Sequence, residues 1–246
     1  MTKHQVVSPE LWLAARTQLL EKEKALTQAR EELAEARRAL PWERVDKQYV
    51  FDTVDGQQSL SDLFDGRSQL IVYHFMFGPQ SDVGCKSCSF WADNFDNALQ
   101  HLAQRDVTLL AVSRAPLAKL QAFKQRLGWS FNWVSSGQNE FNFDLNVSFR
   151  ERDQPSGDLS YNYRPIAKGP APSNAKGGEW QLPGVSVFFK DEAGAIFHTY
   201  STYSRGIDTL NGTYQLLDLT PKGRDEGALP HPQAWVRFHD EYPQSA

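Results

Sequence analysis

The chain has 246 residues, of which 40% are hydrophobic and 12% aromatic, so it can bury the core of one large domain or two small ones. It carries 26 basic and 30 acidic residues, well mixed along the sequence, for a formal net charge of −4. Because no basic region would attract phosphate groups, we expect no nucleic acid among its partners.

The sequence also argues against a membrane. Its longest apolar runs, such as residues 70–77, are far shorter than a spanning helix, and residues 1–10 lack the apolar stretch of a signal peptide. We therefore expect no membrane partner and a cytoplasmic location. Thiols are kept reduced there unless they take part in a reaction cycle, so a purely structural disulfide is disfavoured.

A long charged helix is predicted for the first part of the chain, residues 1–41. Ser8 supplies a capping hydroxyl, Pro9 suits the first helical position, and Pro41 ends the helical pattern. The apolar residues of this helical arm lie on one narrow face: Leu11, Ala15, Leu19, Leu26 and Leu33. So thin a stripe predicts packing against the body of the protein or against a second subunit, which would make the arm the contact of a homodimer.

Strands and helices alternate after the arm. Apolar runs predict strands at residues 49–51, 70–77, 107–112 and 133–135. Helical spacing predicts helices at residues 95–105 and 116–128. This alternation indicates an α/β sheet whose parallel strands are covered by helices. A hairpin and a helix are predicted to follow, at residues 185–189, 196–199 and 207–217.

Residues 150–181 break this pattern. The segment is polar, rich in Pro and Gly, and carries three aromatic residues that favour some docking. A loop this long inside a compact domain is a lid, a binding loop or a disordered insertion. We therefore predict one α/β domain at residues 42–220, with a loop insertion at about 150–181, followed by a charged C-terminal tail at residues 221–246 whose aromatic residues lie against the surface.

The chain has two cysteines, Cys85 and Cys88, directly after the strand predicted at residues 70–77. Two cysteines fall three residues apart by chance in only on the order of one per cent of cases, so the spacing is informative. At the start of a helix that follows a buried strand, backbone N–H groups favour the thiolate. Cys85 would then attack a substrate disulfide or be oxidised to a sulfenic acid, and Cys88 would resolve the intermediate into an intramolecular disulfide.

Other interpretations of the cysteine pair stay open. A zinc site needs two further ligands, but no second CxxC pair exists and the histidines are scattered. Two buried thiols that only pack are another alternative. Covalent haem is excluded, because Ser89 stands where that motif requires histidine. We expect no cofactor and name no metal ligand, and we expect His74 and His198, within predicted strands, to be hydrogen-bonded core residues.

Four further residues are candidates for substrate binding. Ser113 and Arg114 follow the strand predicted at residues 107–112, at the carboxyl end where α/β sheets place ligands. Trp91 comes shortly after the cysteine pair and can equally be a core residue. Arg205 stands in a stretch rich in Thr, Tyr and Ser, which can equally be a sheet edge.

Four stretches of the sequence are long and specific enough to compare with known families: FMFGPQSDVGCKSCSFWADNFDNAL, RDVTLLAVSRAPLAKLQAFKQRLGWSFNWVSS, LPGVSVFF and HTYSTYSRGIDTLNGTYQLLDLTPKGRDE. Together with the helical arm and its exit LPWERV, they resemble the bacterial thioredoxin-like family catalogued as domain of unknown function 899. The resemblance covers nearly the entire chain. It implies a thioredoxin-like, peroxiredoxin-related fold, in which a mixed sheet is flanked by helices, and it implies no known reaction.

The resemblance also assigns residues. The thioredoxin pattern makes Cys85 the attacking thiol and Cys88 the resolving thiol. The proline that faces such a pair, in a cis bond before the next core strand, would be Pro183. The peroxidase motif of peroxiredoxins has proline seven residues, and threonine or serine three residues, before the reactive cysteine, whereas Gly78 and Asp82 stand at those positions here.

The function that these observations favour is thiol-disulfide oxidoreduction through the CxxC pair, with a protein disulfide or a small thiol as the partner. Two alternatives stay open. The fold would serve in one as a non-catalytic binding or assembly module, and in the other as a thiol-dependent peroxidase. The protein would be an enzyme as an oxidoreductase or as a peroxidase, but not as a binding or assembly module.

Overall fold

A computed structural model describes residues 4–156, 159–167 and 175–243. The chain divides into two units, Met1–Pro41 and Trp42–Ala246. No helix in the described ranges combines the length and the apolar character needed to cross a membrane.

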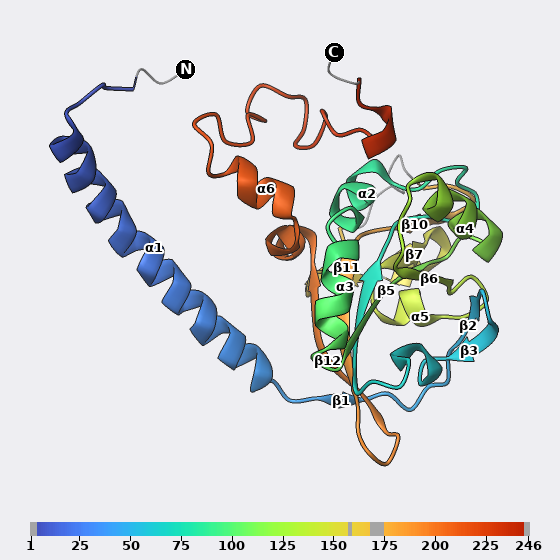
Figure 1. The fold of residues 1–246 in the computed structure, drawn as a ribbon. Coiled ribbons are helices and arrows are strands. Elements are labelled where there is room, and N and C mark those ends of the chain that lie inside the picture. Colours follow the sequence, from blue (N-terminus) through green and yellow to red (C-terminus); the bar gives the residue numbers. More distant parts are fainter. Residues whose placement is uncertain (1–3, 157–158, 168–174, 244–246) are drawn as a thin grey trace. The chain divides into compact units, whose positions relative to one another are not determined.

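The described residues of the first unit, from residue 4 onward, form one helix, α1 (Pro9–Arg38), drawn in blue in Figure 1. The N–H of Leu11 donates to the Ser8 hydroxyl at 3.4 Å, so Ser8 caps the helix as predicted. The predicted helix is therefore confirmed. None of its residues is buried, and the leucines of the predicted stripe expose about half of their surface. What the stripe contacts stays a prediction.

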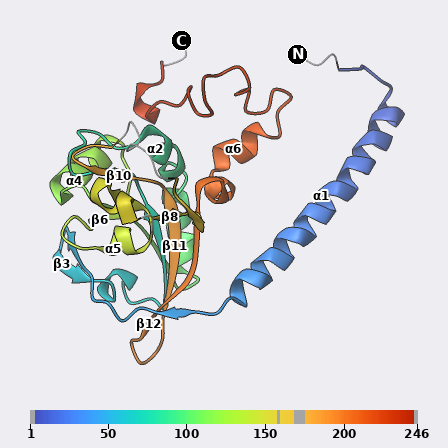
Figure 2. The same ribbon diagram turned by 180° about the vertical axis from the view of Figure 1, so that it is seen from behind.

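The second unit is built on a mixed sheet. Its strands within the described residues, in spatial order, are β1 (Glu43–Arg44), β12 (Ile196–Tyr203), β11 (Gly184–Lys190), β4 (Gln69–His74), β5 (Val107–Ser113), β6 (Asn132–Ser135), β2 (Val50–Thr53) and β3 (Gly56–Ser59). β4, β5 and β6 are parallel, and the other neighbours are antiparallel. The turn of the β11–β12 hairpin projects beyond the other strands (Figures 1 and 2).

Both faces of the sheet are covered. One face packs against α2 (Lys86–Ala92), α3 (Asp96–Ala103) and α4 (Leu117–Arg126), in a core rich in aromatic rings that includes Tyr73 and Trp133. The other face packs against the short helices η1 (Asp62–Phe64) and α5 (Phe141–Asp144), in a core that includes Leu70 and Val112. β4 and β5 contribute to both cores, which explains why their sequences are nearly continuous apolar runs.

The order of the elements confirms the predicted fold class. β4 is joined to the parallel strand β5 through α2 and α3, and the β11–β12 hairpin returns on the other side of β4 before η3 (Ser204–Leu210) and α6 (Gly212–Leu217). This arrangement, a βαβ unit completed by an antiparallel hairpin and a helix, is that of thioredoxin-like proteins. The cysteines therefore follow the carboxyl end of an interior strand, β4, which lies between β11 and β5.

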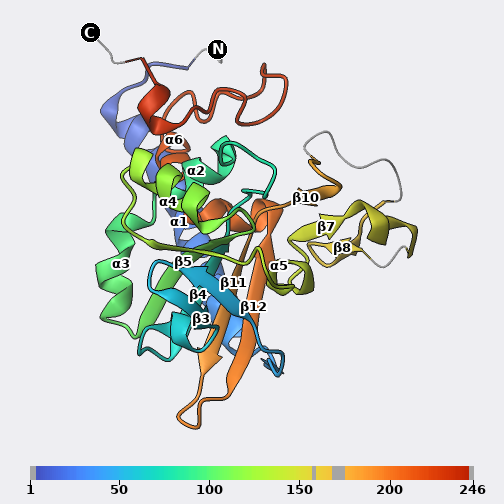
Figure 3. The ribbon, with the colours of Figure 1, turned by 90° about the vertical axis from the view of Figure 1, so that its right-hand side faces the viewer.

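The segment predicted as an insertion forms two small ribbons beside the main sheet (Figure 3). β7 (Ser148–Arg150) pairs with β10 (Glu179–Gln181), and β8 (Ser160–Tyr161) pairs with β9 (Arg164–Pro165). A 3-10 helix, Glu151–Ser156, follows β7. Residues 157–158 and 168–174 of the predicted loop lie outside the described residues. In its described parts, the segment is therefore structured where the sequence predicted a loop.

The C-terminal segment packs on the helical core, as its aromatic residues predicted. The Phe238 ring lies 5.3 Å from the Phe123 ring, and the Trp235 ring lies 5.4 Å from the Phe90 ring. A last short helix, η4 (His239–Glu241), is held by ion pairs from Arg126. The segment thus closes the core next to α2, the helix that carries Cys88.

Candidate functional site

The cysteine pair lies just beyond the carboxyl end of β4, where the chain loops back before α2 begins. The N–H of Cys85 donates to the Met76 carbonyl at 3.2 Å. Gly84 makes this return possible, because a Cβ atom there would lie 2.8 Å from the buried Phe75 ring and 2.9 Å from the Phe123 ring. The residue before Cys85 therefore has to lack a side chain for the thiol to reach the end of the sheet.

Cys85 begins α2 as its capping residue and accepts a hydrogen bond from the N–H of Cys88 at 3.4 Å. The Cys88 thiol, the N–H groups of Cys88 and Ser87 and the Ser87 hydroxyl all stabilise the Cys85 thiolate. They outweigh burial, which acts in the opposite direction, and lower the pKa of the Cys85 thiol to about 7. At neutral pH about half of Cys85 is therefore the nucleophilic thiolate.

Cys88 has the opposite character. Its side chain is fully buried, the N–H of Met76 donates to its sulfur at 3.4 Å, and the Tyr73 hydroxyl donates to its carbonyl at 3.2 Å. Burial, followed by the neighbouring Cys85, raises the pKa of the Cys88 thiol well above its ordinary value. Both cysteines are reduced in the structure, and only Cys85 is partly exposed. Cys85 is thus the activated and partly exposed thiol, and Cys88 is a buried thiol that stays protonated.

Each cysteine lines a cavity. The Cys85 cavity, of about 220 Å³, is walled by residues 76–83 of the loop after β4 and by residues 176–181, which include β10. The Cys88 cavity, of about 190 Å³, is lined by residues of β4, α2 and η3. The thiol that would react with a substrate therefore lies where the predicted insertion meets the loop before α2.

Pro183 lines the Cys88 cavity, so it lies close to the pair as the resemblance implied. Its peptide bond is trans, however, and the expected cis bond is wrong. The trans form is the lower in energy for an X–Pro bond by about 0.5–1 kcal/mol. Leu182, the residue before Pro183, donates its N–H to the Val147 carbonyl at 3.0 Å. The Pro183 carbonyl accepts a hydrogen bond from the Tyr161 hydroxyl at 2.6 Å.

Trp91 and Arg205 line the same Cys88 cavity. Trp91 is also a core residue, because it is buried and its indole N–H donates to the Ile207 carbonyl at 2.8 Å. The Arg205 side chain is 80% exposed and pairs with Asp208 at 2.8 Å, so it forms the rim of the cavity. The structure therefore groups these two predicted residues around Cys88. That they bind a substrate stays a prediction.

The structure places Ser113 away from both cavities. Ser113 is completely buried at the end of β5, its hydroxyl donates to the Phe75 carbonyl at 2.7 Å, and it accepts a hydrogen bond from the Trp133 indole at 3.0 Å. These bonds tie β5 to the chain that leaves β4. Ser113 thus positions the loop that carries the cysteines.

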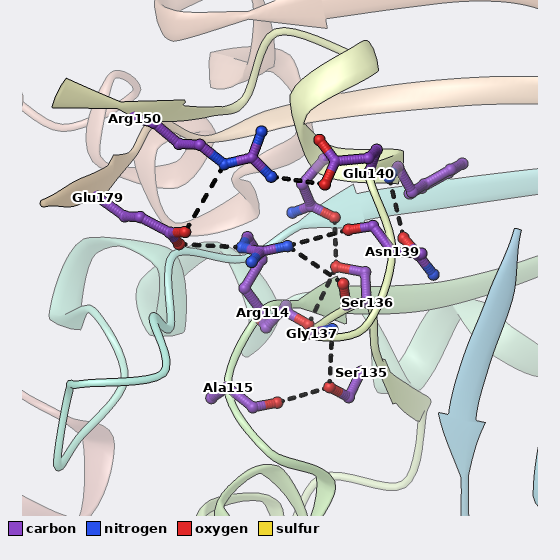
Figure 4. A network of polar contacts seen from close by, with 12 residues as sticks. Arg114, Ala115, Ser135, Ser136, Gly137, Asn139, Glu140, Arg150 and Glu179 are labelled. Atoms are coloured by element: carbon purple, nitrogen blue, oxygen red, sulfur yellow. Dashed lines mark hydrogen bonds and ion pairs between the residues drawn. The ribbon is translucent and has the colours of Figure 1, made fainter. Parts of the chain in front are cut away.

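Arg114 is a buried clamp for the predicted insertion (Figure 4). It donates to the carbonyls of Ser136 and Asn139 at 3.3 and 3.1 Å, and to the Glu179 carboxylate at 3.2 Å. Glu179 lines the Cys85 cavity, so Arg114 reaches that cavity through another residue and not directly. A ring on α5, Phe143, lies against the Arg114 guanidinium at 4.3 Å.

A second arginine extends the clamp. Arg150 donates to Glu140 at 2.5 Å and lies 4.0 Å from the Glu179 carboxylate (Figure 4). Its guanidinium also approaches the Phe143 ring at 3.5 Å. Phe143 therefore contacts two guanidinium groups, and the two arginines are balanced by two glutamates. This network fixes β10, and with it one wall of the Cys85 cavity, to the main sheet.

Two residues of β10, Glu179 and Gln181, line the Cys85 cavity but were not among the candidates predicted from the sequence. Their signal was indirect. They stand shortly before Pro183, which the resemblance placed close to the cysteines, but only the pairing of β10 with β7 shows that they line the cavity.

The two core histidines lie outside the cysteine cavities. His74 is fully buried, and its Nε2 is 2.8 Å from the Ser186 hydroxyl, which confirms that it is a hydrogen-bonded core residue. Burial lowers the pKa of His74 to about 3, so it is neutral. His198 is partly buried and hydrogen-bonded to Ser201 at 2.7 Å. In the described ranges, no group of three or more His, Cys, Asp or Glu side chains is placed to hold a metal ion.

The fold and this site define a thioredoxin-like protein with a CxxC pair at the carboxyl end of a central strand. The chain belongs to the family described as "Bacterial protein of unknown function (DUF899)", whose model matches residues 1–242. The family resemblance noted in the sequence is therefore confirmed. No match was found among curated proteins.

Solved structures similar to this chain include peroxidoxin BcpB from Mycobacterium tuberculosis, with 12% identity, a TM-score of 0.45, and coverage of 72% of this chain and 97% of that chain. A structure of Xanthomonas campestris peroxiredoxin Q has 12% identity and a TM-score of 0.44, covering 67% and 86%. Plasmodium vivax 2-Cys peroxiredoxin has 16% identity and a TM-score of 0.39, covering 73% and 93%. At these identities, no activity in those names is transferred to this chain.

Proposed function

We propose that the protein is a thiol-disulfide oxidoreductase in which Cys85 is the nucleophile and Cys88 the resolving thiol. The observation that carries the proposal is the contrast between the two thiols. Cys85 is partly exposed in a cavity with a pKa lowered to about 7, and Cys88 is buried one helical turn away with a raised pKa. A dithiol catalyst needs one thiolate that attacks the substrate and a second thiol that stays protonated until it resolves the mixed disulfide.

The reaction runs in two exchanges. The Cys85 thiolate attacks one sulfur of a substrate disulfide, a mixed disulfide forms, and the other substrate sulfur leaves as a thiolate with the electron pair of the broken bond. Cys88 then loses its proton and attacks the Cys85 sulfur, which releases the second substrate thiolate and leaves a Cys85–Cys88 disulfide. The substrate has gained two electrons, and an external dithiol returns the pair to the reduced state.

A redox titration tests the proposal. The purified protein, treated with a chelator, is equilibrated in dithiol buffers, its free thiols are trapped by alkylation, and the mass of the peptide with both cysteines is measured. We expect a reversible two-electron transition between about −120 and −270 mV, the range of known dithiol catalysts. If both thiols stay alkylatable at every potential, the pair does not cycle and the proposal fails.

Cys85→Ser supplies the matched control. This variant should lose disulfide reductase activity and keep the melting temperature of the parent protein, because the Cys85 side chain is only partly buried. Unchanged function of the variant in cells would favour a non-catalytic binding or assembly module. Consumption of hydrogen peroxide that depends on Cys85 and on an added dithiol would instead favour a peroxidase, although Gly78 and Asp82 occupy the positions of the peroxidase motif.

A further inference from the structure

The Cys85 cavity contains a buried hydrogen-bond donor with nothing to bind. Gln181 is only 6% exposed, it lines the cavity together with Cys85, and its Nε2 donates to no group in the described part of the protein. Buried polar atoms without a partner are rare in native proteins, because they lose their bonds to water and gain none in return. An unpaired amide beside a reactive thiol is an arrangement that a ligand would complete.

The position of this amide is fixed by the ribbon that carries it. Gln181 and Glu179 stand two residues apart on β10 and therefore on the same face of the strand. Glu179 is held by Arg114, and on the opposite face the Trp180 ring stacks on Phe149 at 5.4 Å. The ion pair and the ring stack therefore fix the backbone of the strand that carries Gln181.

Glycine at position 78 leaves space beside the enclosed amide. A Cβ atom on Gly78 would lie 3.4 Å from Nε2 of Gln181, in direct contact with it. Gly78 has no positive φ, so its backbone conformation is available to other residues and does not by itself require glycine. The missing side chain leaves space for about one methyl group in contact with the donor atom.

The cavity limits the size and the chemistry of the ligand. Its volume of about 220 Å³ exceeds the roughly 150 Å³ that holds a benzene molecule and falls below the roughly 300 Å³ at which sites for drug-sized ligands begin, so it admits about one amino-acid residue. A neutral amide N–H binds an oxygen acceptor such as a carbonyl. One basic residue, Lys176, and one acidic residue, Glu179, also line the cavity, so its walls select no net charge.

We infer that the substrate is a low-molecular-weight disulfide of a peptide-bonded cysteine, whose carbonyl oxygen accepts a hydrogen bond from Nε2 of Gln181 while Cys85 attacks its near sulfur. This inference rests on the proposed function. Gln181 is a positioning residue. It holds the cystine half that forms the mixed disulfide, and the far half leaves as a thiolate with the electron pair of the broken bond.

Two disulfide probes test the inference: the diamide of N,N′-diacetylcystine, which has carbonyl groups beside each sulfur, and cystamine, which has no hydrogen-bond acceptor of this kind. The rate at which each probe oxidises the reduced protein is followed by alkylation and mass measurement. We expect Gln181→Met to slow the diacetylcystine diamide about fivefold, the effect of losing one neutral hydrogen bond, and to change the cystamine rate less than twofold.

Two further variants complete the test. Gly78→Ala places a methyl group against Nε2 and should reproduce the selective loss. Ser148→Ala is the matched control, because Ser148 pairs with Gln181 in register and its buried hydroxyl is also without a partner in the described residues, but it does not line the cavity. It should change neither rate. Gln181→Met should not lower the melting temperature, since the amide nitrogen it removes makes no hydrogen bond.

The outcomes separate this inference from the proposed function. If wild-type protein reacts with neither probe, the proposed function fails. If Gln181→Met slows both probes equally, or slows neither, the thiol still reacts with disulfides but Gln181 does not recognise the carbonyl, and the inference is overturned. If insulin, a folded protein with disulfides, reacts as fast as the diacetylcystine diamide, the size limit set by the cavity is wrong.

Discussion

The reactivity of Cys85 depends on its neighbour in a way that one substitution can measure. The Cys88 thiol is the largest cause of the lowered pKa of Cys85, ahead of the backbone N–H groups of Cys88 and Ser87. Cys88→Ala removes the thiol and keeps the backbone N–H that donates to the Cys85 sulfur at 3.4 Å. The variant should therefore raise the pKa of Cys85 without releasing it from the start of α2.

The size of this effect depends on how far the pKa of Cys85 rises. Its neighbours lower this pKa from an ordinary value of 9.0 to about 7. A rise of about one pKa unit in Cys88→Ala, to about 8, would recover part of that difference. The thiolate fraction at pH 7 then falls from about one half to about one tenth, which is a fivefold loss.

The measurement is the rate of alkylation of Cys85 between pH 5 and pH 10, with circular dichroism to confirm the fold. Because a thiolate of higher pKa is also the stronger nucleophile, the variant should react about twofold more slowly than the wild type at pH 7 and about threefold faster at pH 10, where both thiols are ionised. Ser87→Ala should give a smaller change, since the Ser87 hydroxyl lowers the pKa of Cys85 less than the other donors do. A wild-type midpoint near 8.5, or an unchanged midpoint in Cys88→Ala, would refute the reasoning.

Three substitutions in the body of the protein test contacts of the fold by urea unfolding. Gly84→Ala should cost about 1–3 kcal/mol, because its methyl group would overlap two core rings; unchanged stability would mean that the loop can move away. Arg114→Leu should cost about 3 kcal/mol, since it leaves a partly buried carboxylate without its closest cation, and a loss below about 1 kcal/mol would contradict the clamp. Burial lowers the pKa of His74 from 6.5 to about 3. Below pH 6.5 the unfolded chain therefore binds a proton at this residue that the folded chain does not bind. The free energy of unfolding should accordingly be about 3 kcal/mol lower at pH 4.5 than above pH 6.5. His74→Gln should remove that part of the pH dependence, and an identical slope in the variant would show that other groups cause it.

Much of the fold could be predicted because local patterns and tertiary packing agree. The apolar runs of β4 and β5 are buried on both faces of the sheet, so their sequences carry the signal of a central parallel strand. Ser8 and Pro9 mark the start of α1 through local hydrogen bonding alone. These elements needed no knowledge of distant residues.

The ribbons of the insertion could not be predicted in the same way. β7 and β10 have three residues each, and they pair across about thirty residues of polar sequence. Their stability comes from the Phe149 and Trp180 ring stack and from the Arg114 clamp, both of which join distant parts of the chain. A sequence rich in Pro and Gly gives no periodic signal for such contacts.

The reactive cysteines of the candidate site could be predicted from the sequence, but the residues that line its cavities could not. The spacing of Cys85 and Cys88 identified the pair, and the structure adds the contrast between their pKa values. Ser113 and Arg114 were placed at the correct end of β5, but they face inward, because the buried chain around them offers carbonyl and carboxylate acceptors. A strand end identifies a region of the molecule, and side-chain direction then depends on what packs there.

The arrangement separates two tasks between two parts of the chain. The thioredoxin-like core holds Cys85 at the start of α2, where short-range donors set its pKa whatever the substrate. The β7–β10 ribbon is added to that core, fixed by Arg114, and supplies the wall that carries Gln181. On the proposed function, substitutions in α2 should change how fast every disulfide reacts, because they alter the thiolate. Substitutions in the ribbon should change which disulfide reacts, because they alter only what the cavity can hold.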